Sequence, residues 1–271
     1  MFVERTSFRL PLFLFLLSSA GVFSSPQANV NEIIQRSVAA NQADFKAAPQ
    51  FNHKERDRTA SGTKSYEVLM IDGSPYQRLI AIDGKPLGAG QQADAQKKQQ
   101  QVEDERRSES AEKRSQRIAR YERDRARDNK MMDQLTKAFN FALVGQRKVR
   151  GFNVWVLKAT PRAGYQPPNM ETQVLPGMQG ELWIDQQTYQ WVKVTARVIH
   201  PVSIDGFLAQ VEPGTQFELE KSPVSGGVWQ PSHFGMRSQA KVLFMFNHAS
   251  QDDETYFDYQ PIRQAERGST Q

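Results

Sequence analysis

Residues 180–199, GELWIDQQTYQWVKVTARVI, decide the fold of this chain. Leu182 and Ile184 alternate with polar or aromatic residues, a polar turn follows, and residues 192–198 alternate again. This pattern predicts a β-hairpin. A two-stranded hairpin is at best marginally stable in water. We therefore expect the hairpin to belong to a larger antiparallel sheet whose other strands precede and follow it.

Segments of the same kind recur on both sides of the hairpin, at 51–59, 64–71, 76–82, 141–149, 152–158, 207–211, 215–220, 228–234, 239–247 and 254–261. The first of them is polar and is typical of an edge strand. Asp72-Gly73 and Asp83-Gly84 predict tight turns, because glycine adopts the positive φ that such turns require, and Asp205-Gly206 repeats the pattern. About a dozen short strands of this kind predict a mainly β, α+β fold, with one large curved antiparallel sheet or incomplete β-barrel.

Two segments predict helices. In residues 30–45, Ile33, Ile34 and Val38 recur at helical spacing, and Asn31 is a plausible N-cap. Residues 91–139 contain no glycine or proline and carry acid-first charge pairs four residues apart, which favours a long inserted charged helix. Its last third is amphipathic and should pack on the sheet. The remainder should be solvated.

The N-terminus has the layout of a secretory signal peptide, residues 1–24. Arg5 and Arg9 precede the apolar run 10–17, small residues follow, and cleavage fits after Ala20 or Ser24. The apolar run is shorter than the roughly 20 residues of a spanning helix, so we expect no transmembrane segment in the mature chain; an uncleaved anchor is the alternative. The chain has no cysteine, which excludes disulfides, cysteine lipidation and thiol catalysis. These features predict a periplasmic or secreted protein.

Composition and length favour one domain at 25–271. The 271 residues are 24% charged and 38% hydrophobic, which allows a substantial core. The formal charge is +5, and residues 91–137 carry 13 Lys/Arg against 10 Asp/Glu. Because this run mixes both signs, we expect no nucleic-acid partner. The Pro-rich stretch 159–177 predicts a rim loop or lid, and the polar end at 262–271 predicts a disordered tail.

Several predicted strands, including 68–71 and 242–246, are apolar at every position, so both faces of the sheet should be covered. The concave face is then either a packed core or an apolar ligand cavity, and the pattern leaves both open. Candidate cavity-lining residues are Leu69, Trp155, Tyr165, Trp183, Leu243 and Met245.

Signatures of catalysis and metal binding are missing from the sequence. It has no HExxH, GxSxG, P-loop or GxGxxG motif, and its four histidines are scattered. Ser61 and Lys64 form a bare S-x-x-K pattern without its companion motifs. We therefore expect no enzyme, no catalytic residue, no metal site and no cofactor.

The motif Gly-x-Leu-Trp-Ile-Asp at 180–185, with Lys193 on the return strand and VRGFNVWV at 149–156, resembles the superfamily of outer-membrane lipoprotein-sorting proteins, which are LolA-like carriers and their LolB-like and RseB-like relatives. The resemblance covers residues 30–261. It implies an incomplete antiparallel barrel with helices on its concave side, which in the carriers takes lipid acyl chains. The charged insertion is larger than a plain carrier would need.

The resemblance and the pattern together favour a non-enzymatic binding protein that holds a hydrophobic ligand, such as a lipid or an acylated lipoprotein, in a concave sheet. The alternative is an envelope interaction or sensor module with a filled core that binds a protein partner through the charged helix. A hydrolase would need convergent buried polar residues, which a sequence does not reveal.

Overall fold

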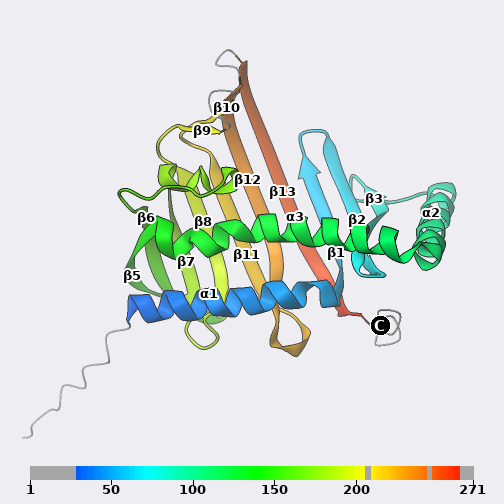
Figure 1. Cartoon of the computed structure of the whole chain (residues 1–271), viewed down its shortest axis with the longest axis horizontal. Coiled ribbons are helices and arrows are strands. Elements are labelled where there is room, and N and C mark those ends of the chain that lie inside the picture. Colours follow the sequence, from blue (N-terminus) through cyan, green and yellow to red (C-terminus); the bar gives the residue numbers. More distant parts are fainter. Residues whose placement is uncertain (1–28, 205–208, 243–245, 263–271) are drawn as a thin grey trace, which may run out of the picture.

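One antiparallel sheet runs through the structure (Figure 1), a computed structural model that describes residues 29–204, 209–242 and 246–262. Its strands are β1 (Phe51–Thr59), β2 (Gly62–Ile71), β3 (Ser74–Ile82), β4 (Lys85–Pro86), β5 (Phe139–Val149), β6 (Phe152–Pro161), β7 (Met178–Asp185), β8 (Trp191–Val198), β9 (Val202–Ile204), β10 (Ala209–Val211), β11 (Gln216–Pro223), β12 (Trp229–Val242) and β13 (Phe246–Pro261). The expected signal peptide, the turn at Asp205-Gly206 and residues 263–271 of the expected tail lie outside the described residues.

The strand order is β4-β3-β2-β1-β13-β12-β11-β8-β7-β6-β5, and β10 pairs with β12 and β9. The first and last strands therefore pair with each other in the interior of the sheet, while β4 and β5 form its edges. The sheet is large, curved and open, which confirms the predicted fold class.

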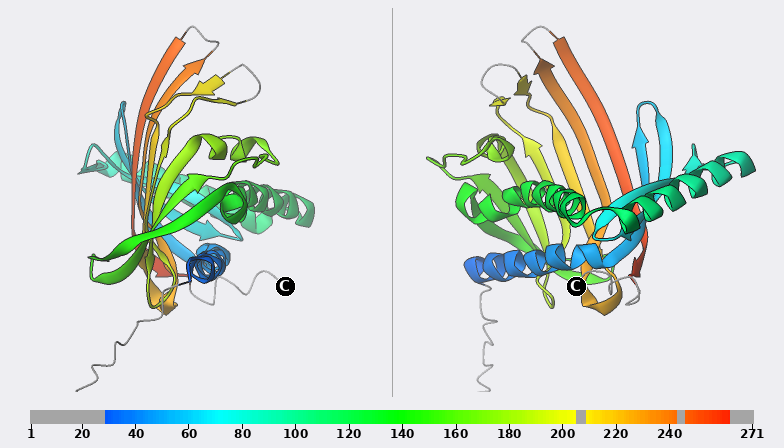
Figure 2. Two further views of the ribbon diagram at one scale, coloured as in Figure 1. Left: turned by 90° about the vertical axis from the view of Figure 1, so that its left-hand side faces the viewer. Right: turned by 45° about the vertical axis from the view of Figure 1, so that its right-hand side comes forward.

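Helices α1 (Val30–Ala47) and α3 (Ala111–Ala138) cross the same face of the sheet, which curves around them (Figure 2). We call this face the helix side and the opposite face the outer face. Helix α2 (Ala89–Ser108) lies beside β3 at one edge. Short 3-10 turns η1 (Ala48–Gln50), η2 (Met170–Thr172), η3 (Leu175–Gly177) and η4 (Ser225–Gly227) complete the described elements. No helix in these ranges combines the length and apolarity that a bilayer crossing requires.

The two Asp-Gly turns are as predicted. Asp72 and Gly73 have φ values of 46° and 85°, and Asp83 and Gly84 have values of 49° and 74°. Positive φ at both central residues is the geometry of a type I′ turn, which matches the twist of the flanking strands. These turns connect β2 to β3 and β3 to β4.

Two local predictions are wrong. The N-cap of α1 is Asn29 and not Asn31, because the Asn29 side chain accepts hydrogen bonds from the backbone N–H groups of Asn31 (3.1 Å) and Glu32 (3.4 Å). Strand β1 is not an edge strand, since it pairs with both β2 and β13. Its polarity has another cause: its two faces carry charges of opposite sign.

The charged insertion forms two helices where one long helix was predicted. The break falls at Glu109, whose φ of −64° and ψ of 146° are extended, and Ser110, whose Oγ accepts from the Lys113 backbone N–H (3.3 Å). Serine competes for backbone hydrogen bonds and favours helix starts, so the Ser108-Glu109-Ser110 sequence ends one helix and caps the next.

Arginines anchor this break to the β2–β3 turn. Arg106 donates to the carbonyl oxygens of Ile71 and Ser74 (both 2.8 Å), and Arg117 donates to that of Asp72 (3.1 Å). Arg117 also pairs with Glu109, whose pKa is held below its usual value by this contact. The insertion is therefore fixed at its corner, while α2 has no buried residue.

Candidate binding faces of the sheet

The helix side carries two rows of apolar residues. Each row crosses six neighbouring strands at right angles to the strand direction. The strand registers place their members directly opposite one another. The first row is Phe141, Ala159, Gly180, Ala196, Phe217 and Met236, and the second is Leu143, Leu157, Leu182, Val194, Leu219 and Phe234.

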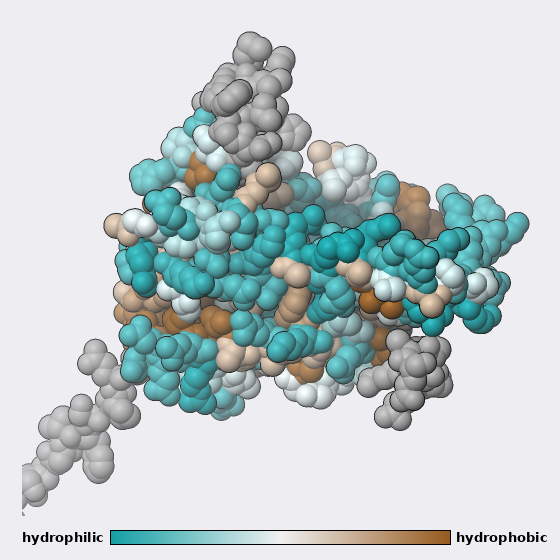
Figure 3. Space-filling model, viewed as in Figure 1, coloured by the Kyte–Doolittle hydropathy of each residue, from teal (hydrophilic) through white to brown (hydrophobic). Residues whose placement is uncertain are grey.

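Burial changes along these rows. On β6 and β7 the members that have a side chain are buried, with Leu157 at 0% and Leu182 at 4% exposure, under α1, α3 and the residues of η3. On β8, β11 and β12 they are half-buried, as Val194, Phe217 and their neighbours show. Figure 3 shows apolar side chains reaching the surface between α1 and α3. The helix side is thus packed most deeply at β6 and β7 and is a partly uncovered apolar surface on either side of them, at β5 and over β8, β11 and β12.

Buried polar contacts hold α1 on this face. Lys221 of β11 donates to Asn41 (2.8 Å) and forms an ion pair with Asp44 (3.1 Å), and both charged side chains are at most 9% exposed. The Trp229 backbone N–H donates to the same carboxylate (3.1 Å). Burial lowers the pKa of Lys221, although Asp44 acts in the opposite direction. These directional contacts fix the position of α1 over the sheet.

The expected Pro-rich loop lies at residues 162–177, because β6 continues to Pro161. Its Tyr165 hydroxyl donates to Gln134 of α3 (3.2 Å), and Lys130 of α3 pairs with Glu171 (3.2 Å) in a half-exposed ion pair. Leu175 is 1% exposed and belongs to the core. The loop is therefore anchored in the core at η3 and tied to α3 by surface contacts.

The helix side becomes acidic beyond β12. Asp252 and Glu254 continue the two rows on β13, and Asp57 lies opposite Glu254 on β1. Burial raises the pKa of Glu55 to about 8, and a hydrogen bond with Asp57 and the charges of Asp57 and Glu254 act in the same direction. Tyr256 donates to Glu254, and its pKa is raised, first by burial and then by that contact.

His53 lies beside this acidic group in an aromatic setting. Its ring stacks on Tyr259 with centroids 5.0 Å apart and lies 6.0 Å from that of Tyr256. Burial lowers the pKa of His53 to about 4, so the imidazole is neutral at pH 7.

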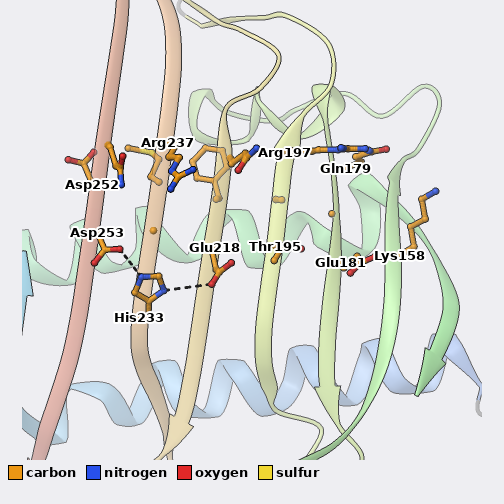
Figure 4. A pocket seen from close by; sticks show the side chains of 17 residues that line it. Lys158, Gln179, Glu181, Thr195, Arg197, Glu218, His233, Arg237, Asp252 and Asp253 are labelled. Carbon is orange, nitrogen blue, oxygen red and sulfur yellow. Dashed lines mark hydrogen bonds and ion pairs between the residues drawn. The ribbon is translucent and has the colours of Figure 1, made fainter. Parts of the chain in front are cut away.

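The outer face carries a polar trough of about 720 Å³ over β6 to β8 and β11 to β13 (Figure 4). Lys158, Arg197 and Arg237 point into it from different strands. His233 bridges two carboxylates there, with Nε2 3.1 Å from Asp253 and Nδ1 3.9 Å from Glu218. Sequence reasoning missed this trough, because its charged residues come from strands far apart along the chain.

The candidate cavity residues are divided between the two faces. Trp155 packs on the helix side against Tyr189, with ring centroids 5.4 Å apart, and Tyr165 lies beside α3. Trp183 packs on the outer face near Val154 and Val156. Leu69 also points to the outer face, since its neighbour Met70 contacts Tyr121 of α3. Leu243 and Met245 lie outside the described residues.

The S-x-x-K pattern lies at the β1–β2 hairpin tip, where the Ser61 hydroxyl hydrogen-bonds to that of Thr59 (2.8 Å). Within the described ranges, no group of three or more His, Asp or Glu side chains could hold a metal ion. Two of the titratable groups with perturbed pKa values, His53 and Glu55, lie among aromatic rings and carboxylates of β1 and β13.

A scan against protein-family models and a search of curated proteins return no match. Solved structures with a similar chain path include a DUF1329 family protein from Desulfovibrio piger (11% identity, 87% of this chain and 94% of that chain, TM-score 0.36). Others are a LolA superfamily protein from Nitrosomonas europaea (10% identity, 88% and 95%, TM-score 0.31) and the MucA/MucB complex from Pseudomonas aeruginosa (12% identity, 86% and 99%, TM-score 0.25). At 10–12% identity and TM-scores of 0.25–0.36, these likenesses concern the chain path alone.

Proposed function

We propose that this protein is an exported, non-enzymatic binding protein that holds an apolar ligand, a lipid or the acyl chain of a lipoprotein, on the helix side of its sheet. The observation that carries the proposal is the incomplete cover of the two apolar rows. Members on β8, β11 and β12, among them Phe217 and Leu219, are only half-buried. Burying apolar surface yields about 25 cal/mol per Å², so this surface favours an apolar occupant.

The elements around this surface suit a ligand that enters and leaves. The loop at residues 162–177 contacts α3 through a half-exposed ion pair, Lys130 with Glu171, and through the Tyr165 hydrogen bond. Arg162, where the loop begins, also donates to the carbonyl oxygens of Thr136 and Ala138. Ion pairs that water reaches contribute only about 0–1 kcal/mol. Helix α1, in contrast, is held by buried polar contacts. We infer that the loop moves to admit the ligand while α1 stays in place.

Export rests on the N-terminal sequence. Residues 1–24 have the charged, apolar and small-residue regions of a secretory signal peptide, and the chain has no cysteine to lipidate. N-terminal sequencing of the protein from an envelope fraction tests this directly: a mature chain that begins at Gly21 or Ser25 supports it, and one that begins at Met1 contradicts it.

The binding test has two parts. Native mass spectrometry and lipid extraction of the purified mature protein should show a co-purifying lipid or acyl chain. The delipidated protein should then take up phenylnaphthylamine, a neutral apolar dye, with saturable fluorescence. The proposal would be refuted if the protein carries no lipid and also does not increase the fluorescence of the dye.

A substitution locates the site. Phe217→Asp places a charge on the helix side, and we expect dye affinity to fall about tenfold or more, since a buried Phe contributes about 1.5–3 kcal/mol. Gln216→Asp is the matched control, because Gln216 is the next residue on β11 and is exposed on the outer face. Circular dichroism of both variants checks that the β-sheet still forms. Equal loss in both would place binding elsewhere.

A second candidate function is capture of an envelope protein partner through α2. This helix projects beyond the β4 edge (Figure 1), has no buried residue and is tied to the β2–β3 turn near its end by Arg106. Charge reversal at Lys97 and Lys98, which leaves the anchor intact, should abolish capture of such a partner without changing dye uptake. Unchanged capture would exclude this role for α2.

A further inference from the structure

The outer trough is separate from the apolar surface, since the sheet itself divides them (Figure 4). Its volume of about 720 Å³ lies within the range of roughly 300–1,000 Å³ found for small-molecule sites. Its lining is charged and amide-rich, which suits a polar ligand.

Three of the four acids that line the trough have partners. Glu218 pairs with Lys193 (2.7 Å), and Asp253 contacts His233 (3.1 Å). Glu181 accepts a hydrogen bond from the Trp183 indole N–H (3.2 Å), which leaves its charge in place. The fourth acid, Asp252, belongs to the row on the helix side.

The cations are not committed in this way. Lys158 and Arg237 are exposed and have no ion-pair partner among the described residues. Arg197 contacts only an uncharged group: with the Gln179 amide oriented to match it, the Gln179 carbonyl oxygen accepts from Arg197 Nε at 2.7 Å. The lining as a whole contains three Lys/Arg and four Asp/Glu. The positive charge that has no carboxylate partner among the described residues is therefore local, at Arg197 and Arg237, and there it favours an anionic ligand.

The spacing of the two arginines narrows the ligand class. Arg197 on β8 and Arg237 on β12 both lie opposite Gln216 of β11, so one strand separates them. Neighbouring strands are about 4.8 Å apart, which places the two backbones about 10 Å from each other. Arg197 leans toward Gln179 on β7, away from Arg237, so the guanidinium groups do not converge on one point (Figure 4).

We propose that this trough binds an elongated dianion, a molecule with two carboxylate or phosphate groups at least about 10 Å apart. One anionic group lies at Arg197 and the other at Arg237, each held by the paired N–H donors of a guanidinium. The Gln216 amide lies between them and is placed to bond a polar middle section of the ligand.

Isothermal titration of the full mature chain with a series of α,ω-dicarboxylates of increasing length tests this. Affinity should rise with length and pass through a maximum at a carboxylate separation of at least about 10 Å. It should then exceed the affinity of a monocarboxylate by about tenfold or more, the gain from a second charged hydrogen bond. A bisphosphate of the same span and inorganic phosphate alone distinguish phosphate ligands from carboxylate ligands. Equal affinity for single and double anions, or no binding of any probe, would overturn the proposal.

Variants localise the effect. Arg197→Gln or Arg237→Gln should reduce dicarboxylate affinity to that of the monocarboxylate, while both should leave phenylnaphthylamine uptake unchanged. Lys148→Gln is the matched control, because Lys148 is an exposed cation on β5 outside the trough lining. An equal loss with Lys148→Gln would show that net charge alone drives binding. Because both arginines are exposed, neither substitution should alter the fold, which circular dichroism verifies.

Discussion

Removing the Asp44 carboxylate should cost much of the stability of the fold. In the Asp44→Ala variant, the Lys221 ammonium keeps only its hydrogen bond to Asn41, and the Trp229 backbone N–H loses its acceptor. Breaking a buried ion pair by removing one partner costs about 3–5 kcal/mol, because the other charge stays buried without compensation. At about 2–4 °C per kcal/mol for a chain of this size, we expect Tm to fall by ~6–20 °C.

Thermal and urea unfolding followed by circular dichroism measure this loss. The matched control is Glu32→Ala, which breaks the exposed pair of Glu32 with Arg36 on the same helix and should cost at most about 1 kcal/mol. The double variant Asp44→Leu, Lys221→Met should recover most of the loss, since apolar residues of similar size replace a buried pair at little cost.

Two results would refute this reasoning. If Asp44→Ala costs no more than Glu32→Ala, the buried pair does not hold α1. If the double variant is as unstable as the sum of its two single variants, the loss comes from packing and not from an unpaired charge. Because α1 covers part of the helix side, we also expect Asp44→Ala to bind more of an apolar dye before it unfolds.

Three further predictions concern pH and packing. The pKa of His53 is about 4 in the folded protein and 6.5 in the unfolded chain. Its contribution to the free energy of unfolding is therefore complete above pH 6.5 and is lost as pH falls toward 4. His53→Phe should make the stability against urea less dependent on pH over that range. Glu55 has the opposite sign. Because its pKa is raised from 4.5 to about 8, its contribution to stability is complete below about pH 4.5 and is lost as pH rises through 8, and Glu55→Gln should remove this slope between pH 4.5 and 8. Gly177→Ala should destabilise by about 1–3 kcal/mol, since a Cβ there would lie 2.9 Å from the His200 carbonyl oxygen, whereas Gly90→Ala, with open space around it, should not destabilise the helix.

The sequence was informative where the determinants are local. Alternation in residues 180–199 predicts the β7–β8 hairpin, and Asp72-Gly73 and Asp83-Gly84 predict turns whose positive φ values the structure contains. Helix α1 follows from its apolar spacing. The break at Glu109 was not predicted, because the charge pairs of the insertion favoured one continuous helix. The local signal for the break was the Ser-Glu-Ser sequence.

The candidate sites depend on register, which one sequence does not determine. The apolar rows join residues of six strands, and the trough cations come from β6, β8 and β12. Part of the information was nevertheless present. Trp183 alternates with Leu182 and Ile184, and this parity already placed it on the opposite face from the hairpin's core residues. The prediction that Trp183 and Trp155 line the same cavity overlooked this alternation of side chains along a strand.

Strand β1 shows how the two faces depend on each other. Glu55 and Asp57 point to the helix side, so Lys54, Arg56 and Arg58 point to the outer face, where Arg56 lies over the Phe257 ring. A slip of one residue against β13 would move the acids to the outer face and bring the cations under the helices. The pairing of β1 with β13 therefore sets the charge of both faces at once. Because these two strands are the first and last of the sheet, their long-range contact costs the most loop entropy and should form late in folding. The acidic end of the helix side and the basic outer face should accordingly appear together, in the step that completes the sheet.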